Sequence, residues 1–215
     1  MSFINEIANL CEAMGADVHD VARAMGLDGR IGKKFLHPGP GYGGSCFPKD
    51  TRALSRMAIE RGYPFKILEA VIKVNDEQKK RMINKIEEKV GDLKGKTIGI
   101  LGLSFKPNTN DIRESSSIAI IQGLLATGAK VKAFDPGAME EAKAVLPEIE
   151  YGKDAYDVAK GVDALVLATE WNQFRRLDLQ RIRGLLKSPI FIDLRNVYDP
   201  DQMKRLGFSY CGVGR

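Results

Sequence analysis

The sequence predicts an α/β protein in which a helical segment precedes a doubly wound, mainly parallel sheet. Two observations carry this prediction. Apolar residues recur at helical spacing in the first part of the chain, whereas short apolar runs alternate with helical patterns from residue 97 onwards. Strands that alternate with helices imply right-handed crossovers and parallel pairing. The period changes at the polar segment 91–96, so we predict a helical domain over 1–93 and a sheet domain over 94–215.

Four helices are expected in the first domain. The first has no convincing N-terminal cap and stops at Gly15, so we expect it to be the end of a longer helix. Asp17 is expected to cap the second helix and Asp50 the third, which Gly62 closes. The buried face of the third helix is expected to be Ala53, Leu54, Met57 and Ala58.

The fourth helix, over residues 64–90, carries an apolar stripe that a highly charged middle, 76–81, interrupts. The stripe comprises Ile67, Leu68, Val71, Ile72, Met82, Ile83, Ile86 and Val90. A helix of this length cannot bury its stripe within so small a domain, which predicts a partner surface and a homodimer.

In the second domain the apolar runs that predict strands lie at 97–103, 130–134, 164–168 and 190–194, with weaker strands at 149–151 and 208–213. Helical patterns lie between them, at about 115–127, 137–146, 154–160 and 175–186.

The composition is that of an ordinary globular protein, 44% hydrophobic and 28% charged. The net charge of +5 comes from interspersed basic residues, which argues against nucleic-acid binding and suits a small anionic ligand. Without a signal peptide or a membrane-spanning apolar run, a cytoplasmic protein with no membrane partner is expected. The cysteines at 11, 46 and 211 have no metal-binding spacing, so no metal is predicted.

The strongest chemical signal is the stretch GYGGSCFPKD at 41–50, in which Cys46 follows small residues and precedes Lys49 and Asp50. Glycines let backbone approach a polar ligand closely. A helix N-terminus and a nearby cation both favour the thiolate form of Cys46, which is a nucleophile for covalent catalysis. Asp50 could act as a base toward a bound water or alcohol.

A second candidate site follows the first predicted strand. Residues 104–115 form a long polar loop that carries Lys106 and Arg113 before the next helix starts. Ligands of doubly wound sheets bind beyond the carboxyl ends of the strands, and two cations beside a helix N-terminus suit an anion.

Three other features are interpreted as structural. The stretch GPGYGG at 39–44 matches G-x-G-x-x-G but neither follows a strand nor opens a helix, so it does not predict a dinucleotide site. Asp135 ends a strand before Pro136 and is expected to cap the next helix. His19 and His37 are isolated in the sequence and predict neither a catalytic triad nor a metal site.

These motifs resemble the UDP-glucose/GDP-mannose dehydrogenase family, in particular its UDP-glucose 6-dehydrogenase branch. The resemblance covers essentially the whole chain, in the family's order. It begins in the middle of the family sequence, so it implies a C-terminal portion without the N-terminal NAD-binding domain. Besides 41–50 it rests on DGRIG at 28–32, GLSFKP at 102–107, DIRES at 111–115 and DLRN at 193–196.

The resemblance also implies a fold and an activity. The second domain would be a Rossmann-like UDP-sugar-binding domain, and the first a central dimerisation domain that carries the thiol loop. The family enzyme oxidises the C6 alcohol of UDP-glucose to a carboxylate in two hydride transfers to NAD. Its cysteine holds the intermediate aldehyde as a thiohemiacetal, which becomes a thioester.

Site residues carry over by position in the matching motifs. Cys46 and Asp50 would be catalytic. Lys49 and Arg113 would lie near the NAD pyrophosphate. The substrate-binding residues would be Arg30, which reaches across the dimer, Phe35, Gly43, Lys106 and Arg195.

Several functions stay open at this point. Because the family's upstream catalytic lysine and asparagine and its NAD fold would have to come from a separate N-terminal half, the chain alone is expected to be inactive. The alternatives are a nucleotide-sugar-binding or dimerisation module without catalysis, and a GDP-mannose dehydrogenase fragment, against which Tyr42 and Phe47 argue. A nicotinamide-independent thiol enzyme is disfavoured because no histidine is placed near Cys46.

Overall fold

The computed structural model describes all 215 residues, and its first part is helical as predicted. Gly15 ends the first helix in a left-handed conformation, with φ of 69°, and the Asp17 carboxylate caps the second by accepting from the His19 N–H at 2.8 Å. The helices are α1 (Ser2–Met14), α2 (Val18–Gly26), α3 (Phe47–Glu60) and α4 (Lys66–Val90).

The second part is a six-stranded sheet in the order β3-β2-β1-β4-β5-β6, in which every neighbouring pair is parallel. The predicted doubly wound parallel sheet is therefore confirmed. Its strands are β1 (Thr97–Leu101), β2 (Lys130–Phe134), β3 (Glu150–Tyr151), β4 (Ala164–Leu167), β5 (Ile190–Asp193) and β6 (Ser209–Cys211). Its helices are α5 (Ser116–Ala126), α6 (Met139–Val145), α7 (Ala155–Ala159), α8 (Leu179–Leu185) and α9 (Pro200–Arg205), with a 3₁₀ turn over Asn172–Arg176.

The two faces of the sheet bury different apolar clusters, because successive side chains of a strand point to opposite faces. Ile98 and Ile100 of β1 belong to the cluster that contains residues of α1, α4 and α5. Leu101 belongs to the cluster under α7, α8 and α9. The first of these clusters also joins both parts of the chain, so the domain division at 93/94 stays a prediction.

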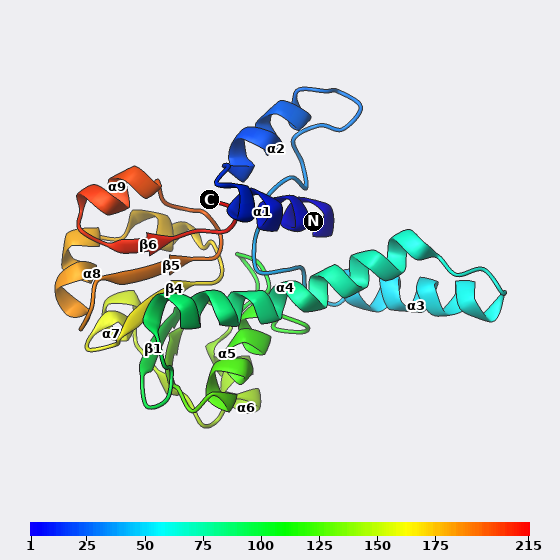
Figure 1. Cartoon of the computed structure of the whole chain (residues 1–215). Coiled ribbons are helices and arrows are strands. Elements are labelled where there is room, and N and C mark those ends of the chain that lie inside the picture. Colours follow the sequence, from blue (N-terminus) through cyan, green and yellow to red (C-terminus); the bar gives the residue numbers. More distant parts are fainter.

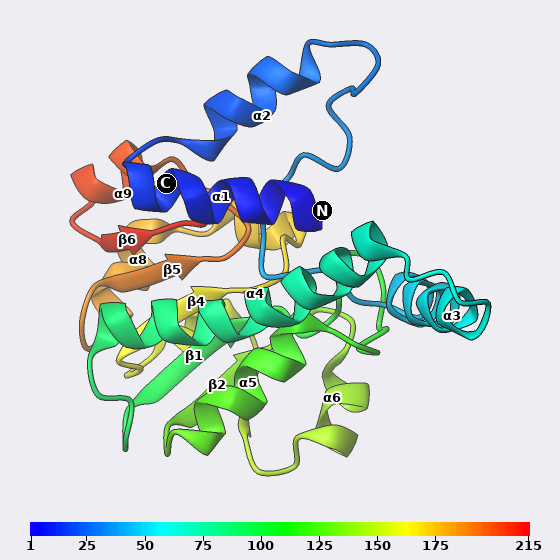
Figure 2. The same cartoon turned by 45° about the vertical axis from the view of Figure 1, so that its right-hand side comes forward.

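The helices that cover the first face are seen in Figure 1, where α4 runs across the sheet beside α5 and below α1. α4 packs against α1, α3 and α5. Only its second half lies over the sheet. Its first half and α3 extend away from the body as a helical hairpin, which is viewed nearly along α3 in Figure 2.

This arrangement corrects the expected face of α3. Ala53 and Leu54 are exposed, Leu54 with 48% of its surface, Met57 is 60% exposed and Ala58 is half-buried. The reason is that α4 is the main helix on which α3 packs within one chain, so most of the apolar stripe of α3 faces solvent. The buried residues of α3 are instead Pro48 and Ser55.

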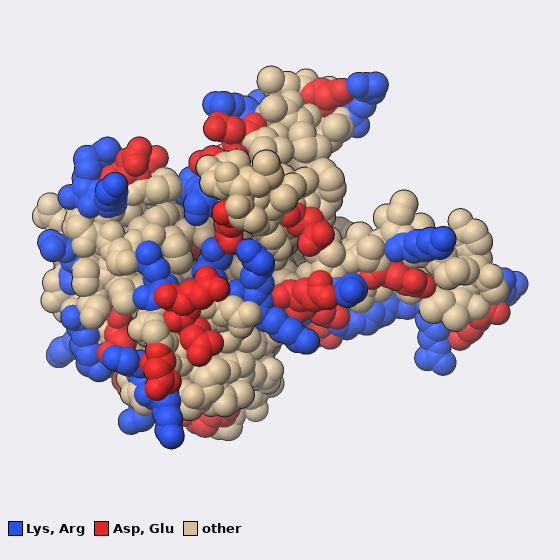
Figure 3. Space-filling model, viewed as in Figure 1, with Lys and Arg blue, Asp and Glu red and all other residues tan.

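The surface carries charges of both signs. Lys and Arg are interspersed with Asp and Glu over the face shown in Figure 3, without a field of one sign. None of the helices, including the 25-residue α4, combines the length and apolar character that a membrane crossing requires.

Candidate functional site

Cys46 occupies the N-cap position of α3, with an exposed side chain. Its carbonyl accepts the first helical hydrogen bond, from the Asp50 N–H at 2.8 Å. The expectation that Asp50 caps this helix is therefore wrong, because Asp50 lies in the first turn with its N–H already used. Because Cys46 and not Asp50 is the N-cap, the helix begins four residues earlier than expected, and the thiol lies at the positive end of the helix dipole.

The thiol loop, residues 41–50, packs against the loop after β1, residues 102–115, at Gly43 and Gly44. The Gly44 N–H donates to the Arg113 carbonyl at 2.8 Å. A Cβ at Gly43 would lie 2.3 Å from the Glu114 carbonyl oxygen, and one at Gly44 would lie 2.9 Å from the Phe105 ring. Only glycine permits this approach, so the backbones of the two predicted sites form one continuous site.

The fold brings Arg113 close to the thiol loop, since the Gly44 N–H donates to its carbonyl at 2.8 Å. Its pKa is raised mainly by the hydrogen bond to Asp111 and in part by the charge of Cys46. Lys49, the cation that the sequence indicated, places its ammonium 3.1 Å from the Asp50 carboxylate. Sequence reasoning missed the proximity of Arg113 because 67 positions separate it from Cys46.

Glu114 connects three elements at this junction. Arg52 of α3 donates two hydrogen bonds to its carboxylate, at 3.0 and 3.4 Å, and these hold the pKa of Glu114 below its usual value. Lys79 of α4 lies 3.9 Å from the same carboxylate. Glu114 is held with φ of 53°, a conformation that a non-glycine residue adopts at a cost. The sequence offered no signal for this cluster.

Buried side-chain amides hold the base of the thiol loop. Asn75 of α4 accepts from the Tyr42 N–H at 2.8 Å and donates to the Tyr42 carbonyl at 3.1 Å. The Gly39 N–H donates to Asn5 at 2.9 Å, and Gln78 donates to the Gly39 carbonyl at 2.9 Å. The three amide residues Asn5, Asn75 and Gln78 are almost fully buried. In the sequence, these polar residues interrupt the apolar stripes of α1 and α4. A buried role for them could have been predicted from that interruption.

Asn75→Leu is expected to lower the free energy of unfolding by about 2–4 kcal/mol, because it leaves the buried N–H and carbonyl of Tyr42 unpaired. Chemical denaturation would measure the loss. Asn84→Leu is the matched control, since Asn84 is exposed on the same helix. Equal destabilisation by the two variants would contradict the role of Asn75.

Arg195 is part of the same site. Its Nε donates to the Ala168 carbonyl at 2.8 Å and its guanidinium lies 3.1 Å from Glu170. Its Nη2 donates to the Phe105 carbonyl at 3.3 Å, and its Nη1 would lie 3.3 Å from a Cβ at Gly39. Arg195 therefore lies against the loop after β1 and the segment before the thiol loop, in addition to its ion pair with Glu170.

A buried carboxylate positions the turn that carries Arg195. Asp193 accepts from the N–H groups of Arg195, Val197 and Tyr198 and from the Tyr210 hydroxyl, at 2.7 to 3.0 Å. Burial raises the pKa of Asp193, although these hydrogen bonds oppose the shift.

Asp135 has a similar structural role. α6 has Ala138 at its N-cap position, so the expected capping by Asp135 is wrong in detail. The Asp135 carboxylate instead accepts from the N–H groups of Leu103 and Ser104, at 2.7 and 3.0 Å, and from those of Gly137 and Ala138. It thereby fixes the start of the loop that carries Lys106.

The remaining predicted residues differ in their distance from Cys46. Lys106 is exposed, with its Nζ 5.3 Å from the centre of the Phe105 ring. Phe35, with φ of 66°, lies edge-on to Phe47, the residue after Cys46, at 6.5 Å between ring centres. Arg30 is held by Asp28 on the segment that follows α2, and no contact joins it to the thiol loop within this chain.

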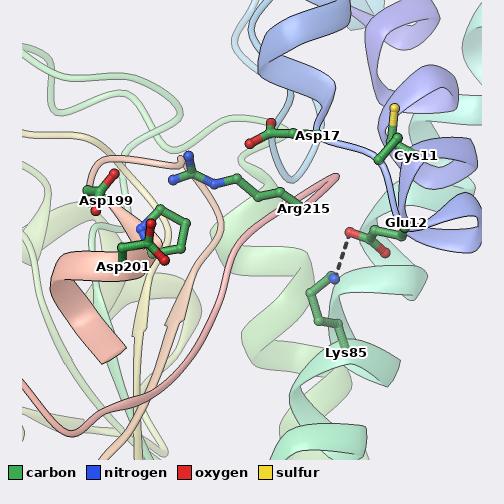
Figure 4. Close-up of a pocket in the computed structure, with 10 residues that line it drawn as sticks. Cys11, Glu12, Asp17, Lys85, Asp199, Asp201 and Arg215 are labelled. Carbon is green, nitrogen blue, oxygen red and sulfur yellow. Dashed lines mark hydrogen bonds and ion pairs between the residues drawn. The ribbon is translucent and has the colours of Figure 1, made fainter. Parts of the chain in front are cut away.

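A cavity of about 650 Å³ contains none of the predicted site residues. Figure 4 shows it between the end of α1, the start of α9 and the C-terminal residue Arg215. Its wall includes the ion pair of Glu12 with Lys85, at 2.7 Å. Burial opposes ionisation of Glu12, but hydrogen bonds from Lys85 and Gly214 hold its pKa below the usual value. This pair joins α1, α4 and the chain end, which is a structural role.

No group of three or more histidine, cysteine, aspartate or glutamate side chains is arranged to hold a metal ion.

Comparisons with known proteins match the whole chain. The model for the central domain of the UDP-glucose/GDP-mannose dehydrogenase family matches residues 1–77, and the model for its UDP binding domain matches residues 99–200. The UDP-glucose 6-dehydrogenase of Rhizobium meliloti is 50% identical over 100% of this chain and 49% of its own length. The UDP-glucose 6-dehydrogenase TuaD of Bacillus subtilis is 48% identical over 100% of this chain and 47% of its own length.

The fold also matches solved structures. A UDP-glucose dehydrogenase from the archaeon Pyrobaculum islandicum superposes with a TM-score of 0.89 and 38% identity, over 100% of this chain and 47% of that one. The chain thus spans about half the length of the relatives that it matches.

Proposed function

Because the chain belongs to the UDP-glucose/GDP-mannose dehydrogenase family, we propose that it forms part of a UDP-glucose 6-dehydrogenase that converts UDP-glucose to UDP-glucuronate. The observation that supports the proposal is the close packing of the loop that contains Cys46 on the loop that contains Arg113, through the Gly44–Arg113 hydrogen bond and the close approach at Gly43. A thiol nucleophile with basic residues on the adjoining loop suits covalent chemistry on an anionic ligand.

The nucleotide sugar is proposed to bind beyond the carboxyl ends of the strands. Lys106 follows β1 and Arg195 follows β5, so both lie at this edge. Exposed Lys106 would contact a phosphate or sugar oxygen. The Gly43 backbone would pack on the sugar, Phe35 would lie near it, and Arg30 would reach the site of a second copy.

Cys46 is proposed to carry the covalent step. Its sulfur would add to the C6 aldehyde, forming a C–S bond while the carbonyl oxygen takes a proton, and the product is a thiohemiacetal. Loss of a hydride and a proton from this adduct leaves a thioester. Water then attacks the thioester carbon and the C–S bond breaks, which releases the carboxylate and restores the thiol. The covalent bond would keep the aldehyde from escaping between the two oxidations.

NAD, when bound, would accept the two hydrides. Arg113 fits an anionic cofactor group in part: its guanidinium is exposed, but two of its nitrogens bond Asp111, at 2.8 and 2.9 Å. Lys49 is also exposed and would contribute a second positive charge on the thiol side. Asp50, exposed one helical turn from Cys46, is proposed to orient or activate the water that hydrolyses the thioester.

Calorimetry with UDP tests the proposal directly. We expect saturable UDP binding, and Lys106→Ala should weaken it about tenfold because a charge-assisted hydrogen bond is lost. Lys160→Ala is the control, since this exposed lysine follows α7 on the opposite edge of the sheet. No UDP binding, or equal losses in the two variants, would contradict the assignment.

We further propose a homodimer, because apolar side chains are exposed on neighbouring helices. They are Phe3, Leu10 and Met14 of α1, Leu54, Met57 and Ile59 of α3, and Ile67 of α4. Burial of this surface against a second copy would remove it from water.

Sedimentation at micromolar concentration is expected to show a dimer of the 23.7 kDa chain. Met57→Asp should shift the population to monomer, since a charge would enter the apolar surface. Val145→Asp, at an exposed apolar position on α6, is the matched control and should not. A monomer at every concentration would contradict the proposed dimer.

A second candidate function is nucleotide-sugar binding without chemistry, which the match to the UDP binding domain favours. A GDP-mannose dehydrogenase is the third, since the family model includes that branch. Adding the N-terminal half of a family member in trans separates the candidates. NAD reduction with UDP-glucose supports the first, reduction with GDP-mannose alone supports the third, and binding without reduction supports the second.

A further inference from the structure

The two histidines of the chain, isolated in the sequence, come together in the structure. His19 of α2 and His37 of the segment before the thiol loop line one cavity of about 230 Å³. Arg23 and Lys33 lie on the same wall. Ala22, Leu36 and Pro38 are the other lining residues. This cavity shares no residue with the candidate site around Cys46.

The charges around this cavity are mostly positive. Arg23 is paired with Asp20 at 2.7 Å, and Asp17 is engaged in capping α2. Lys33 and His37 have no ion pair or hydrogen bond with any side chain of the protein. Burial lowers the pKa of His19, and the charges of Arg215 and His37 lower it further, against the opposing effect of Asp17 and Asp20. Arg23 and Lys33 thus form a cationic rim of the cavity, and the two imidazoles add hydrogen-bonding groups to it.

The walls also limit the shape of a ligand. Leu36 and Pro38 are buried and Ala22 is half-buried, so they present an apolar surface beneath the cationic rim. The Asn196 amide donates to His19 Nε2 at 3.0 Å, which leaves the ring proton on Nδ1. A Cβ at Gly26 would lie 3.0 Å from Lys33 Cγ, so the lysine stem packs closely against the end of α2.

We propose that His19, Arg23, Lys33 and His37 form a second binding site, for a small organic phosphate monoester. The phosphate would accept hydrogen bonds from the cations of Arg23 and Lys33 and from the imidazole N–H groups, and the organic group would lie on Ala22, Leu36 and Pro38. Pro38 directly precedes Gly39, whose backbone is held by Asn5 and Gln78 at the base of the thiol loop. A ligand here would bridge α2 and that base.

Nuclear magnetic resonance tests the site without any enzyme activity. Because the chain has two histidines, their Cε1–H signals report the cavity individually, and His37→Asn assigns them. Titration with phenyl phosphate is expected to shift both signals saturably. Lys33→Ala should weaken binding about threefold to tenfold, since its charge is partly screened by water. Lys34→Ala, exposed and outside the cavity, should not.

Four results would overturn the proposal. They are the absence of a saturable shift, an equal effect of Lys33→Ala and Lys34→Ala, an undiminished affinity in Ala22→Phe, which fills the cavity, and equal or tighter binding of inorganic phosphate. Competition with UDP distinguishes this site from the proposed nucleotide-sugar site. UDP should not displace phenyl phosphate, and Lys106→Ala should not change phenyl phosphate binding. Displacement by UDP would mean that the two sites are one, whereas loss of UDP binding alone would contradict only the proposed function.

Discussion

Iodoacetamide is expected to alkylate Cys46 at least about tenfold faster than either other cysteine at neutral pH. Cys46 is exposed at the N-terminus of α3, whereas Cys11 is 5% exposed. Cys211 is half-buried, and burial raises its pKa, which lowers its thiolate fraction. Mass spectrometry of the three cysteine peptides over time would measure the rates. Equal rates would remove the case for an activated thiol.

The cation that acts on Cys46 can be identified in the same assay. Arg113→Ala is expected to slow alkylation several-fold, because Arg113 lies on the loop that the Gly44 N–H contacts and its positive charge would be lost. Lys49→Ala should slow it less, since the Lys49 ammonium lies 3.1 Å from Asp50. A larger effect of Lys49→Ala would show that the sequence pattern identified the right cation and the structural assignment is wrong.

Gly43→Ala is expected to separate the two halves of the candidate site. The new Cβ would meet the Glu114 carbonyl oxygen at 2.3 Å, and neither backbone can yield without breaking the Gly44–Arg113 hydrogen bond. We expect a loss of about 1–3 kcal/mol in the free energy of unfolding, as for other overpacked sites. UDP affinity should fall with it, because the loops that carry Cys46 and Lys106 move apart.

Gly29→Ala is the matched control for this substitution. A Cβ at Gly29 meets nothing within 4 Å, and its φ is not in the left-handed region. Denaturation and UDP calorimetry on both variants provide the comparison. If Gly43→Ala behaves like Gly29→Ala, the close approach of the two loops is not a requirement of the site.

The candidate site was predicted in part because its motifs are local. The glycines, Cys46, Lys49 and Asp50 lie within one stretch of ten residues, and a helix start after Cys46 follows from Pro48 in its first turn. The motifs could not show which distant charge reaches the thiol. They also could not show that the apolar stripe of α3 stays exposed, because that depends on how much partner surface one chain supplies.

The sequence by itself determined most of the elements, with the exception of α9, and the parallel pairing of the strands, since periodicity and caps such as Asp17 act over a few residues. Only the tertiary structure decided the contacts between those elements. Arg52 bonds Glu114 across 62 positions, and Asn75 bonds the backbone of Tyr42 across 33. His19 and His37, 18 positions apart, line one cavity. Such pairs form because α4 crosses the sheet and two loops meet above it, and no local propensity encodes that geometry.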